Sequence, residues 1–375
     1  MRRVSLLLTM ALLVVASVPA SAGRGDAAPP GRWPVCGEWR QVGSTDFSTP
    51  RDVAVVSPTE AWALAVHVDM FSTSEVLHWT GWAWQEVPFP TPAGDPRGVE
   101  LNALAVVSPD EVWVVGEVYD PDWGPRPLSA RWDGERWQLV PIGLPTVHQG
   151  LTGVAVEPGT STLLAVGALH WGAVYGKQHT LVLRWLGDRW VRVPSPKVGR
   201  ASGFADVVAT GSSAWMVGAF KPGTARLNDH VLAARLLDDR WTVFRGGPGS
   251  LEAVDALTPD LVWAVGPGKD VTPQRGIVMR WSGGTWTTVR RLSGGSALLD
   301  VTVASPAETW AVGYRGGQYP GRTLVMRRHG SSWRHSPFPD SRGWITAIDG
   351  TPHNLWTFRR HVVIDSAHSR SYHRC

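Results

Sequence analysis

Basic and aromatic side chains recur in the polar stretches that separate the apolar segments of this chain. Arginine binds carboxylate and phosphate through paired hydrogen bonds, and aromatic rings stack on sugar faces and on cations. A site that combines both residue types suits an anionic polymer or a glycan. The candidate binding residues are Trp123, Trp171, Tyr175, Lys221, Arg226, Lys269, Arg275, Arg315, Tyr319 and Arg322. The alternative is a solvated loop surface with incidental charges.

A second set of candidates is acidic. Asp206, Asp255, Asp300 and Asp349 recur within apolar segments, and the last three fall at nearly equivalent positions. Carboxylates in such an arrangement could cleave a polysaccharide, hold a cation, or accept hydrogen bonds from the backbone. The acids to examine are therefore Asp255, Asp300 and Asp349.

Motifs for other chemistries are absent from the sequence. It has no G-x-S-x-G, no phosphate loop and no H-x-x-x-H. His170, His179 and His230 are expected to lie near one another, but no carboxylate spacing accompanies them. We therefore expect no metal site and no cofactor. Whether the protein is an enzyme stays open, with a non-catalytic role favoured.

The elements that position these residues follow from an internal repeat. Its marker positions are Trp62, Trp113, Leu164, Trp215, Trp263, Trp310 and Trp356, which are 51, 51, 51, 48, 47 and 46 residues apart. Each unit contains four short stretches rich in Val, Trp, Leu and Thr, bounded by Ser-Pro, Gly or Asp-Gly, which is typical of strands. Four strands at this period predict an all-β propeller with seven four-stranded blades.

Phrases such as "RWDGERW" recur where the third strand should turn into the fourth. Gly-x-x-Trp occurs five times, ending at Trp84, Trp137, Trp190, Trp286 and Trp333, and Asp238 replaces the glycine before Trp241. Glycine tolerates the positive φ of a tight hairpin, and the indole should cover apolar area against the next blade. The pattern indicates a structural joint. The alternative is a repeated aromatic platform for sugars.

Closure of the ring is expected to involve both ends of the chain. Residues 36–47 resemble an unpaired fourth strand with Trp39 in the marker place, so the N-terminal strand should complete the last blade. Tyr372 also matches the marker, which makes "SYHRC" a competing fourth strand. Cys36 and Cys375 are the only cysteines and lie at the two ends of the circle, which predicts a disulfide in an exported protein.

The N-terminus has the features of an export signal. Arg2 and Arg3 precede an apolar run and a small-residue cleavage site, so residues 1–22 are predicted to be a signal peptide, 23–35 a flexible leader and 36–375 the propeller. Removing Arg2 and Arg3 lowers the formal charge from +4 to +2. We expect a secreted monomer with no affinity for nucleic acid and no membrane insertion.

The consensus "SPxExWAVG … WxGxxWxxVPxP" resembles a repeat of secreted bacterial propellers, especially actinobacterial ones of the kelch- or galactose-oxidase-like type. The resemblance covers about 36–375 and implies the propeller fold. The Gly-Gly pair of kelch repeats is missing, and only Asp133, Gly134 and Trp137 remain of a sialidase Asp-box. Both cysteines are assigned to closure, so the copper site of galactose oxidase is not implied. The short tryptophan repeats also resemble tectonin-type lectins, which implies glycan binding.

The connections between second and third strands share one face with the connections between blades, and both are long here. Loops carry binding sites more often than strands do. We therefore predict a secreted, non-catalytic propeller that binds a glycan, an anionic cell-envelope polymer or a protein through this face. The alternative is a polysaccharide hydrolase or lyase with acids at the channel mouth.

Overall fold

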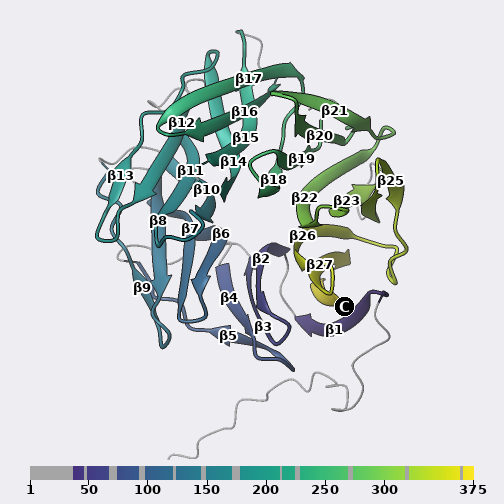
Figure 1. The fold of residues 1–375 in the computed structure, drawn as a ribbon. Helices are drawn as coiled ribbons and strands as arrows, with labels where there is room; N and C mark the ends of the chain where they lie inside the picture. The colour runs from purple at the N-terminus through teal and green to yellow at the C-terminus, as the bar shows by residue number, and fades with distance from the viewer. Residues whose placement is uncertain are drawn as a thin grey trace, which may run out of the picture.

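The structure, a computed structural model, describes residues 37–45, 49–66, 74–92, 98–120, 124–144, 149–170, 178–211, 213–223, 229–268, 273–316, 321–363 and 366–375. This part of the chain forms seven antiparallel four-stranded sheets arranged in a ring, as the sequence predicted (Figure 1). Among the described residues, no helix is long and apolar enough to cross a membrane.

The first three blades follow the chain without interruption. Blade 1 contains β2 (Thr49–Ser57), β3 (Glu60–Val66), β4 (Ser74–Trp79) and β5 (Trp84–Val87). Blade 2 contains β6 (Val99–Ser108), β7 (Glu111–Asp120), β8 (Gly124–Trp132) and β9 (Trp137–Leu139). Blade 3 contains β10 (Gln149–Val156), β11 (Leu163–His170), β12 (Gln178–Trp185) and β13 (Trp190–Arg192).

The remaining blades repeat this order, and the last one also uses the start of the chain. Blade 4 contains β14 (Ala201–Thr210), β15 (Ser213–Lys221), β16 (His230–Leu237) and β17 (Arg240–Pro248). Blade 5 contains β18 (Ala253–Thr258), β19 (Leu261–Gly266), β20 (Ile277–Ser282) and β21 (Thr285–Arg291). Blade 6 contains β22 (Ser296–Ser305), β23 (Glu308–Arg315), β24 (Arg322–His329) and β25 (Ser332–His335). Blade 7 contains β26 (Trp344–Thr351), β27 (Asn354–Val363), β28 (Ser366–Arg374) and β1 (Arg40–Thr45).

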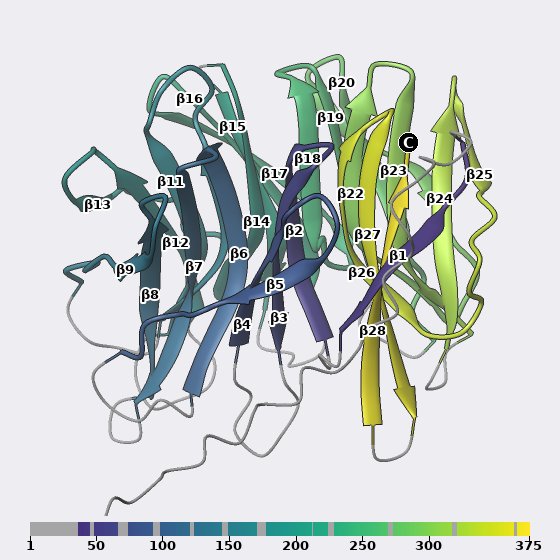
Figure 2. The same ribbon diagram turned by 90° about the horizontal axis from the view of Figure 1, so that it is seen from below.

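The first strand of every blade lies at the centre of the ring (Figure 1). Each of these inner strands contacts the next, and β26 contacts β2, so the ring is closed. Figure 2 shows the blades edge-on, with second and third strands joining at the lower side for β27 and β28. We call the face where second and third strands join the loop face, and the opposite one the turn face.

The tight hairpins between third and fourth strands have the backbone that the sequence predicted. The glycines of the Gly-x-x-Trp phrases all have positive φ, between 61° at Gly283 and 97° at Gly187. Asp238, which replaces this glycine in blade 4, has a φ of 48°. The repeated phrase is therefore set by the backbone of the turn.

Tryptophans join neighbouring blades, which confirms that the phrase is a structural joint. Trp62 of β3 packs on Trp132 and Trp137 of blade 2, with ring centroids 5.3 and 5.7 Å apart. Trp113 makes the same contacts to blade 3, and Trp215 to blade 5. The fourth-strand indole thus packs against the preceding blade. Our expectation that it packs against the following blade was wrong.

The N-terminal strand completes blade 7, as predicted. β1 pairs with β28, with Gln41 opposite Tyr372, and Trp39 packs edge-on against Trp310 of blade 6 at 5.7 Å. The competing assignment was wrong in an informative way. "SYHRC" belongs to the third strand of the blade, because β27 extends to Val363 and β28 pairs with it from Ser366 to Arg374.

One side chain on each inner strand bonds to the backbone of the next blade. Five of the seven contacts use an aspartate, which accepts one amide from its own strand and one from its neighbour. The donor–acceptor pairs are Leu104 N–Asp52 Oδ2 (2.8 Å), Asn102 Nδ2–Leu151 O (2.9 Å), Thr152 Oγ1–Phe204 O (2.8 Å), Val254 N–Asp206 Oδ2 (2.8 Å), Val303 N–Asp255 Oδ2 (2.6 Å), Ile348 N–Asp300 Oδ2 (2.6 Å) and Val55 N–Asp349 Oδ2 (2.8 Å). These bonds follow the ring around its whole circumference.

We predict that Cys36 and Cys375 form a disulfide that fastens β1 to blade 7. Cys36 lies outside the described residues, but the amide of its neighbour Gly37 donates to the carbonyl of Cys375 at 3.0 Å. Closing this long loop would raise the free energy of unfolding by at most roughly 5–6 kcal/mol. Reductant should therefore lower the Tm of the wild type and leave that of Cys375→Ser unchanged. Two alkylatable thiols in the native, unreduced protein would contradict the prediction.

Candidate functional site

A cavity of about 330 Å³ opens on the loop face between blades 4 and 5. Its wall is formed by the ends of β14 and β15 and by the segment that leads into β18. The lining includes Thr152, Ser202, Gly203, Phe204, Gly218, Phe220, Lys221, Asp229, Ser250 and Glu252. We call this space the face cavity. Cavities of this size, with mixed polar and apolar walls, are typical of small-ligand sites.

Polar groups converge on the face cavity. Ser202 is only 2% exposed, and its Oγ makes no hydrogen bond to any described residue. Lys221 Nζ lies 3.7 Å from Asp229 Oδ1, so a cation and an acceptor stand together at the cavity wall. A buried hydroxyl without a partner is costly unless a ligand or water supplies the missing bond.

Arginines form a row across the loop end of blade 6. Arg315 pairs with Arg322 across the β23–β24 hairpin, and Ser296 pairs with Arg315 on its other side. Single bridges add Arg275 next to Ser296 and Arg342 next to Arg322. Side chains paired across a ladder project from the same face of the sheet. We call Arg275, Arg315, Arg322 and Arg342 the arginine row.

The arginine row is exposed. No carboxylate of the described residues forms an ion pair with any of its four guanidinium groups, whereas Asp340 nearby pairs with Arg359 and Arg370. Burial, together with Arg315 and Arg290, lowers the pKa of His335. Like charges placed side by side destabilise a sheet, and a bound anion would relieve this repulsion.

An aromatic pair adjoins the arginine row, because Tyr314 directly precedes Arg315 in β23. Tyr314 stacks on Trp344 of blade 7 with ring centroids 4.6 Å apart, and its hydroxyl donates to Gln274 Oε1 at 2.6 Å. Burial and the negative charge of Glu252, which lines the face cavity, raise the pKa of Tyr314. Tyr314 therefore adjoins the arginine row and lies within electrostatic range of a residue that lines the face cavity.

The structure brings together three of the predicted binding residues, Arg275, Arg315 and Arg322. Lys221 lies apart from them at the face cavity. The other predicted residues lie outside the described part of the chain: Trp123, Trp171, Tyr175, Arg226, Lys269 and Tyr319.

Sequence reasoning missed Trp344, Arg342 and Ser202. The sequence contains a signal for Trp344. It stands at the start of the first strand of blade 7, where the equivalent residues of blades 6 and 2 are Ala297 and Glu100, so a large aromatic residue is unusual at this position of the repeat. Blade 7 also departs from the repeat at Arg359. Five other blades have a glycine at this position, and a Cβ added to any of these glycines would collide with a carbonyl of the first strand. Arg359 is 3% exposed and binds Asp340 at 2.7 Å.

The predicted channel acids, Asp255, Asp300 and Asp349, accept hydrogen bonds from backbone amides, including one from the next blade. Asp255 and Asp349 lie opposite Trp263 and Trp356, so they are equivalent. Asp300 lies two residues earlier in the repeat, in register with Asp52 and Asp206, so our grouping of it with Asp255 and Asp349 was wrong. Each of these carboxylates accepts a backbone amide from the next blade, which gives it a role in joining blades.

Burial raises the pKa of all five inter-blade aspartates. The pKa rises from 3.8 to about 6 for Asp52 and to about 7 for Asp206 and Asp349, with desolvation as the main cause and the backbone amides opposing it. The other channel acids add to the rise at Asp206 and Asp349. No group of three or more His, Cys, Asp or Glu side chains in the described ranges is arranged to hold a metal ion.

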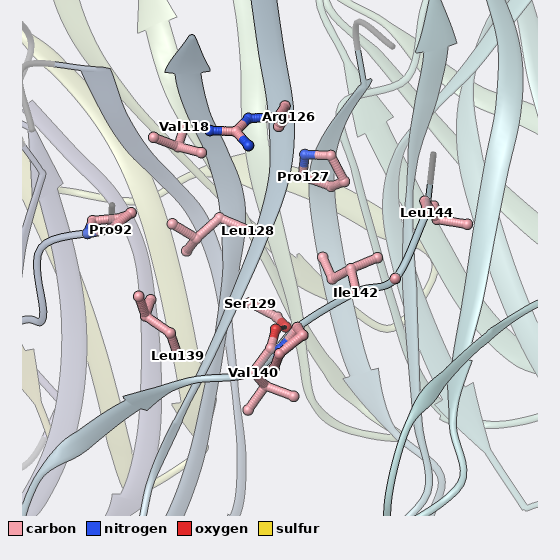
Figure 3. Close-up of a pocket in the computed structure, with 12 residues that line it drawn as sticks. Pro92, Val118, Arg126, Pro127, Leu128, Ser129, Leu139, Val140, Ile142 and Leu144 are labelled. Atoms are coloured by element: carbon pink, nitrogen blue, oxygen red, sulfur yellow. Dashed lines mark hydrogen bonds between the residues drawn. The ribbon is translucent and has the colours of Figure 1, made fainter. Parts of the chain in front are cut away.

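Figure 3 shows another cavity, of about 290 Å³, beside β8 in blade 2. Its lining is mostly apolar and includes Pro127, Leu128, Ile142 and Leu144, with Arg126 at one side. The space exists because β9 pairs with β8 only from Ala130 to Trp132. Pro127 occupies the uncovered edge, and proline has no N–H with which to add a further strand. None of the predicted site residues lines this cavity.

Comparison with known proteins supports the fold. No protein-family model matches the chain, and no curated protein matches its sequence. Among solved structures, the chain is similar to YCF48 bound to D1 peptide, with a TM-score of 0.55 and 14% identity over 92% of this chain and 97% of that chain. The chain is a seven-bladed β-propeller. The fold is consistent with a binding or interaction role, and the resemblance to kelch-, galactose-oxidase- or tectonin-type repeats stays a prediction.

The raised pKa values predict that the ring is more stable in mild acid. The native state binds these protons more tightly than the unfolded chain does, so their stabilising contribution is complete near pH 4 and is lost as the pH rises through about 7. Compared with Asp206→Asn, which cannot titrate, the wild type should lose roughly 3 kcal/mol of unfolding free energy between pH 4.5 and 7.5. Urea denaturation of both proteins measures this. If the unfolding free energy of the wild type rose with pH relative to that of Asp206→Asn, the prediction would be wrong.

Proposed function

We propose that this protein is a secreted, non-catalytic binding propeller that recognises an anionic glycan or cell-envelope polymer on its loop face. The arginine row is the observation that supports this most directly. Four exposed arginines lie in one row, with Ser296 between Arg275 and Arg315 and without an ion-pairing carboxylate among the described residues. The row of five paired positions spans about 19 Å at the usual strand spacing. A polymer with repeating carboxylate or phosphate groups matches such a row better than a single small anion does.

The face cavity supplies a second contact for the same ligand. Its hydroxyl and ion pair suit hydrogen bonds to a sugar residue, while Phe204 and Phe220 provide apolar surface. Tyr314 stacks on Trp344, precedes Arg315 of the row and is affected by the charge of Glu252 at the cavity. A glycan chain could therefore place one sugar in the cavity and its anionic groups along the row.

A protein partner is the second candidate. The similar structure of YCF48 holds a D1 peptide, which shows that a propeller of related shape can bind a polypeptide. At 14% identity this likeness concerns the fold, so the charge of the loop face decides our preference for an anionic polymer.

Replacing Arg275, Arg315 and Arg322 together by alanine should weaken binding to polygalacturonate and to poly(glycerol phosphate). We expect roughly tenfold weaker binding at low salt and a smaller salt dependence, because three exposed ionic contacts are lost. The Tm should stay unchanged or rise slightly, since like charges are removed. Isothermal titration at several NaCl concentrations measures both effects.

The matched control removes three exposed arginines from the turn face, Arg136, Arg189 and Arg240, and should leave binding unchanged. Equal loss in both triple variants would reduce the site to net charge alone. A reducing-sugar assay on polygalacturonate tests the enzymatic alternative in the same samples. Turnover that depends on Asp255 or Asp300 would overturn the non-catalytic role.

Filling the face cavity should separate its contribution from that of the arginines. Ser202→Leu adds apolar volume where a sugar would sit, so binding to polygalacturonate should fall by roughly three- to tenfold. The salt dependence should stay as in the wild type, because no charge changes. Ser250→Ala, which removes a hydroxyl from the same cavity lining without filling the cavity, is the control and should reduce binding less. Unchanged affinity in Ser202→Leu, with a native circular-dichroism spectrum, would exclude the cavity from the site.

A further inference from the structure

The junction between blades 3 and 4 lacks rings that the other junctions have. Six blades carry a tryptophan at the marker position of the second strand, and blade 3 carries Leu164. The third-strand position that meets this ring is tryptophan or arginine in the other blades and Leu236 in blade 4. Both changes fall at one junction, so two large side chains are missing from the same place.

A carboxylate and a guanidinium like those that surround the indole in other blades are present there. In blade 6, Glu308 accepts the indole N–H of Trp310 at 2.7 Å and pairs with Arg327, whose guanidinium lies over the ring. Blade 2 repeats the hydrogen bond and the ion pair with Glu111, Trp113 and Arg131. In blade 3 the position equivalent to Glu308 is Thr162. Glu157, which follows β10, pairs with Arg184 at 3.6 Å, so a carboxylate and a cation line the same cavity as Leu164.

A cavity of about 290 Å³ opens at this junction, near the hairpin turns and therefore on the turn face. We call it the indole slot. Its apolar lining includes the buried Leu164, Ala214 and Leu236 and the exposed Leu186, and its polar lining includes Thr162, Glu157, Arg184, Asp238 and Asp239. Arg184 Nη1 binds Asp239 at 2.9 Å, while its Nε is buried and makes no hydrogen bond among the described residues.

We propose that the indole slot binds a tryptophan side chain of a partner polypeptide. Such a ring would pack on the exposed Leu186, lie against the Arg184 guanidinium and donate its N–H to Glu157, as Trp310 does with Arg327 and Glu308 in blade 6. Three acids and one arginine line the slot, so basic residues beside the tryptophan would be favoured. This site uses a different face and a different ligand class from the proposed polymer site, and it stands independently of that proposal.

Binding is tested with an acetylated and amidated Lys-Gly-Trp-Gly-Lys peptide, followed by saturation-transfer NMR on the full chain. One buried ring predicts a Kd on the order of 1 mM. The same peptide with leucine in place of tryptophan should bind at least roughly tenfold more weakly. Failure of the tryptophan peptide to bind, while free indole binds, would show a small-molecule site and overturn the assignment to a polypeptide.

Leu164→Trp should fill the slot with the protein's own ring. We expect peptide binding to disappear and the Tm to rise, because the Glu157–indole–Arg184 arrangement is completed. Leu257→Trp adds a tryptophan at an exposed position of blade 5 outside the slot, and should change neither property. Equal binding by wild type and Leu164→Trp would overturn the proposal.

Glu157→Ala keeps the slot open and supplies a test that does not depend on the folding of Leu164→Trp. Loss of the acceptor should weaken the tryptophan peptide by roughly three- to tenfold and leave the leucine peptide unchanged. An equal change for both peptides would mean that the indole N–H does not reach Glu157, and would contradict the proposed geometry.

Discussion

The closed ring depends on hydrogen bonds that run from each inner strand to the backbone of the next blade. In five junctions an aspartate accepts two amides, one from each blade, and in the other two Asn102 and Thr152 donate to a carbonyl. A blade buries both faces of its sheet only between two neighbours, so every blade needs the whole circle. The bond from Val55 to Asp349 joins the last blade to the first and acts together with the pairing of β1 and β28.

These carboxylates combine two opposing effects. Burial disfavours their charged form, while two well-aligned amides favour it. The raised pKa values show that burial has the larger effect. Aspartates that could have been taken for catalytic acids therefore have a structural explanation, and the site must be sought at the ends of the strands.

Departures from the repeat mark both proposed sites. Trp344 and Arg359 interrupt the pattern of blade 7 beside the arginine row, and Leu164 and Leu236 interrupt it at the indole slot. A repeat protein tolerates such exceptions because each blade contacts only its neighbours. The two sites lie on opposite faces, so a propeller with both would join an anionic polymer to a polypeptide partner.

The sequence by itself determined the fold class, the number of blades, the glycine turns and closure by the N-terminal strand. These features depend on period, on alternation within strands and on the backbone demands of tight turns, all of which are local. The tertiary structure alone decided that β28 is a third strand, that the arginine row forms, and that the face cavity and the indole slot open. A row of side chains depends on the register between Arg275, Arg315 and Arg342, which are far apart in the chain, and a cavity depends on the volumes of side chains from two blades.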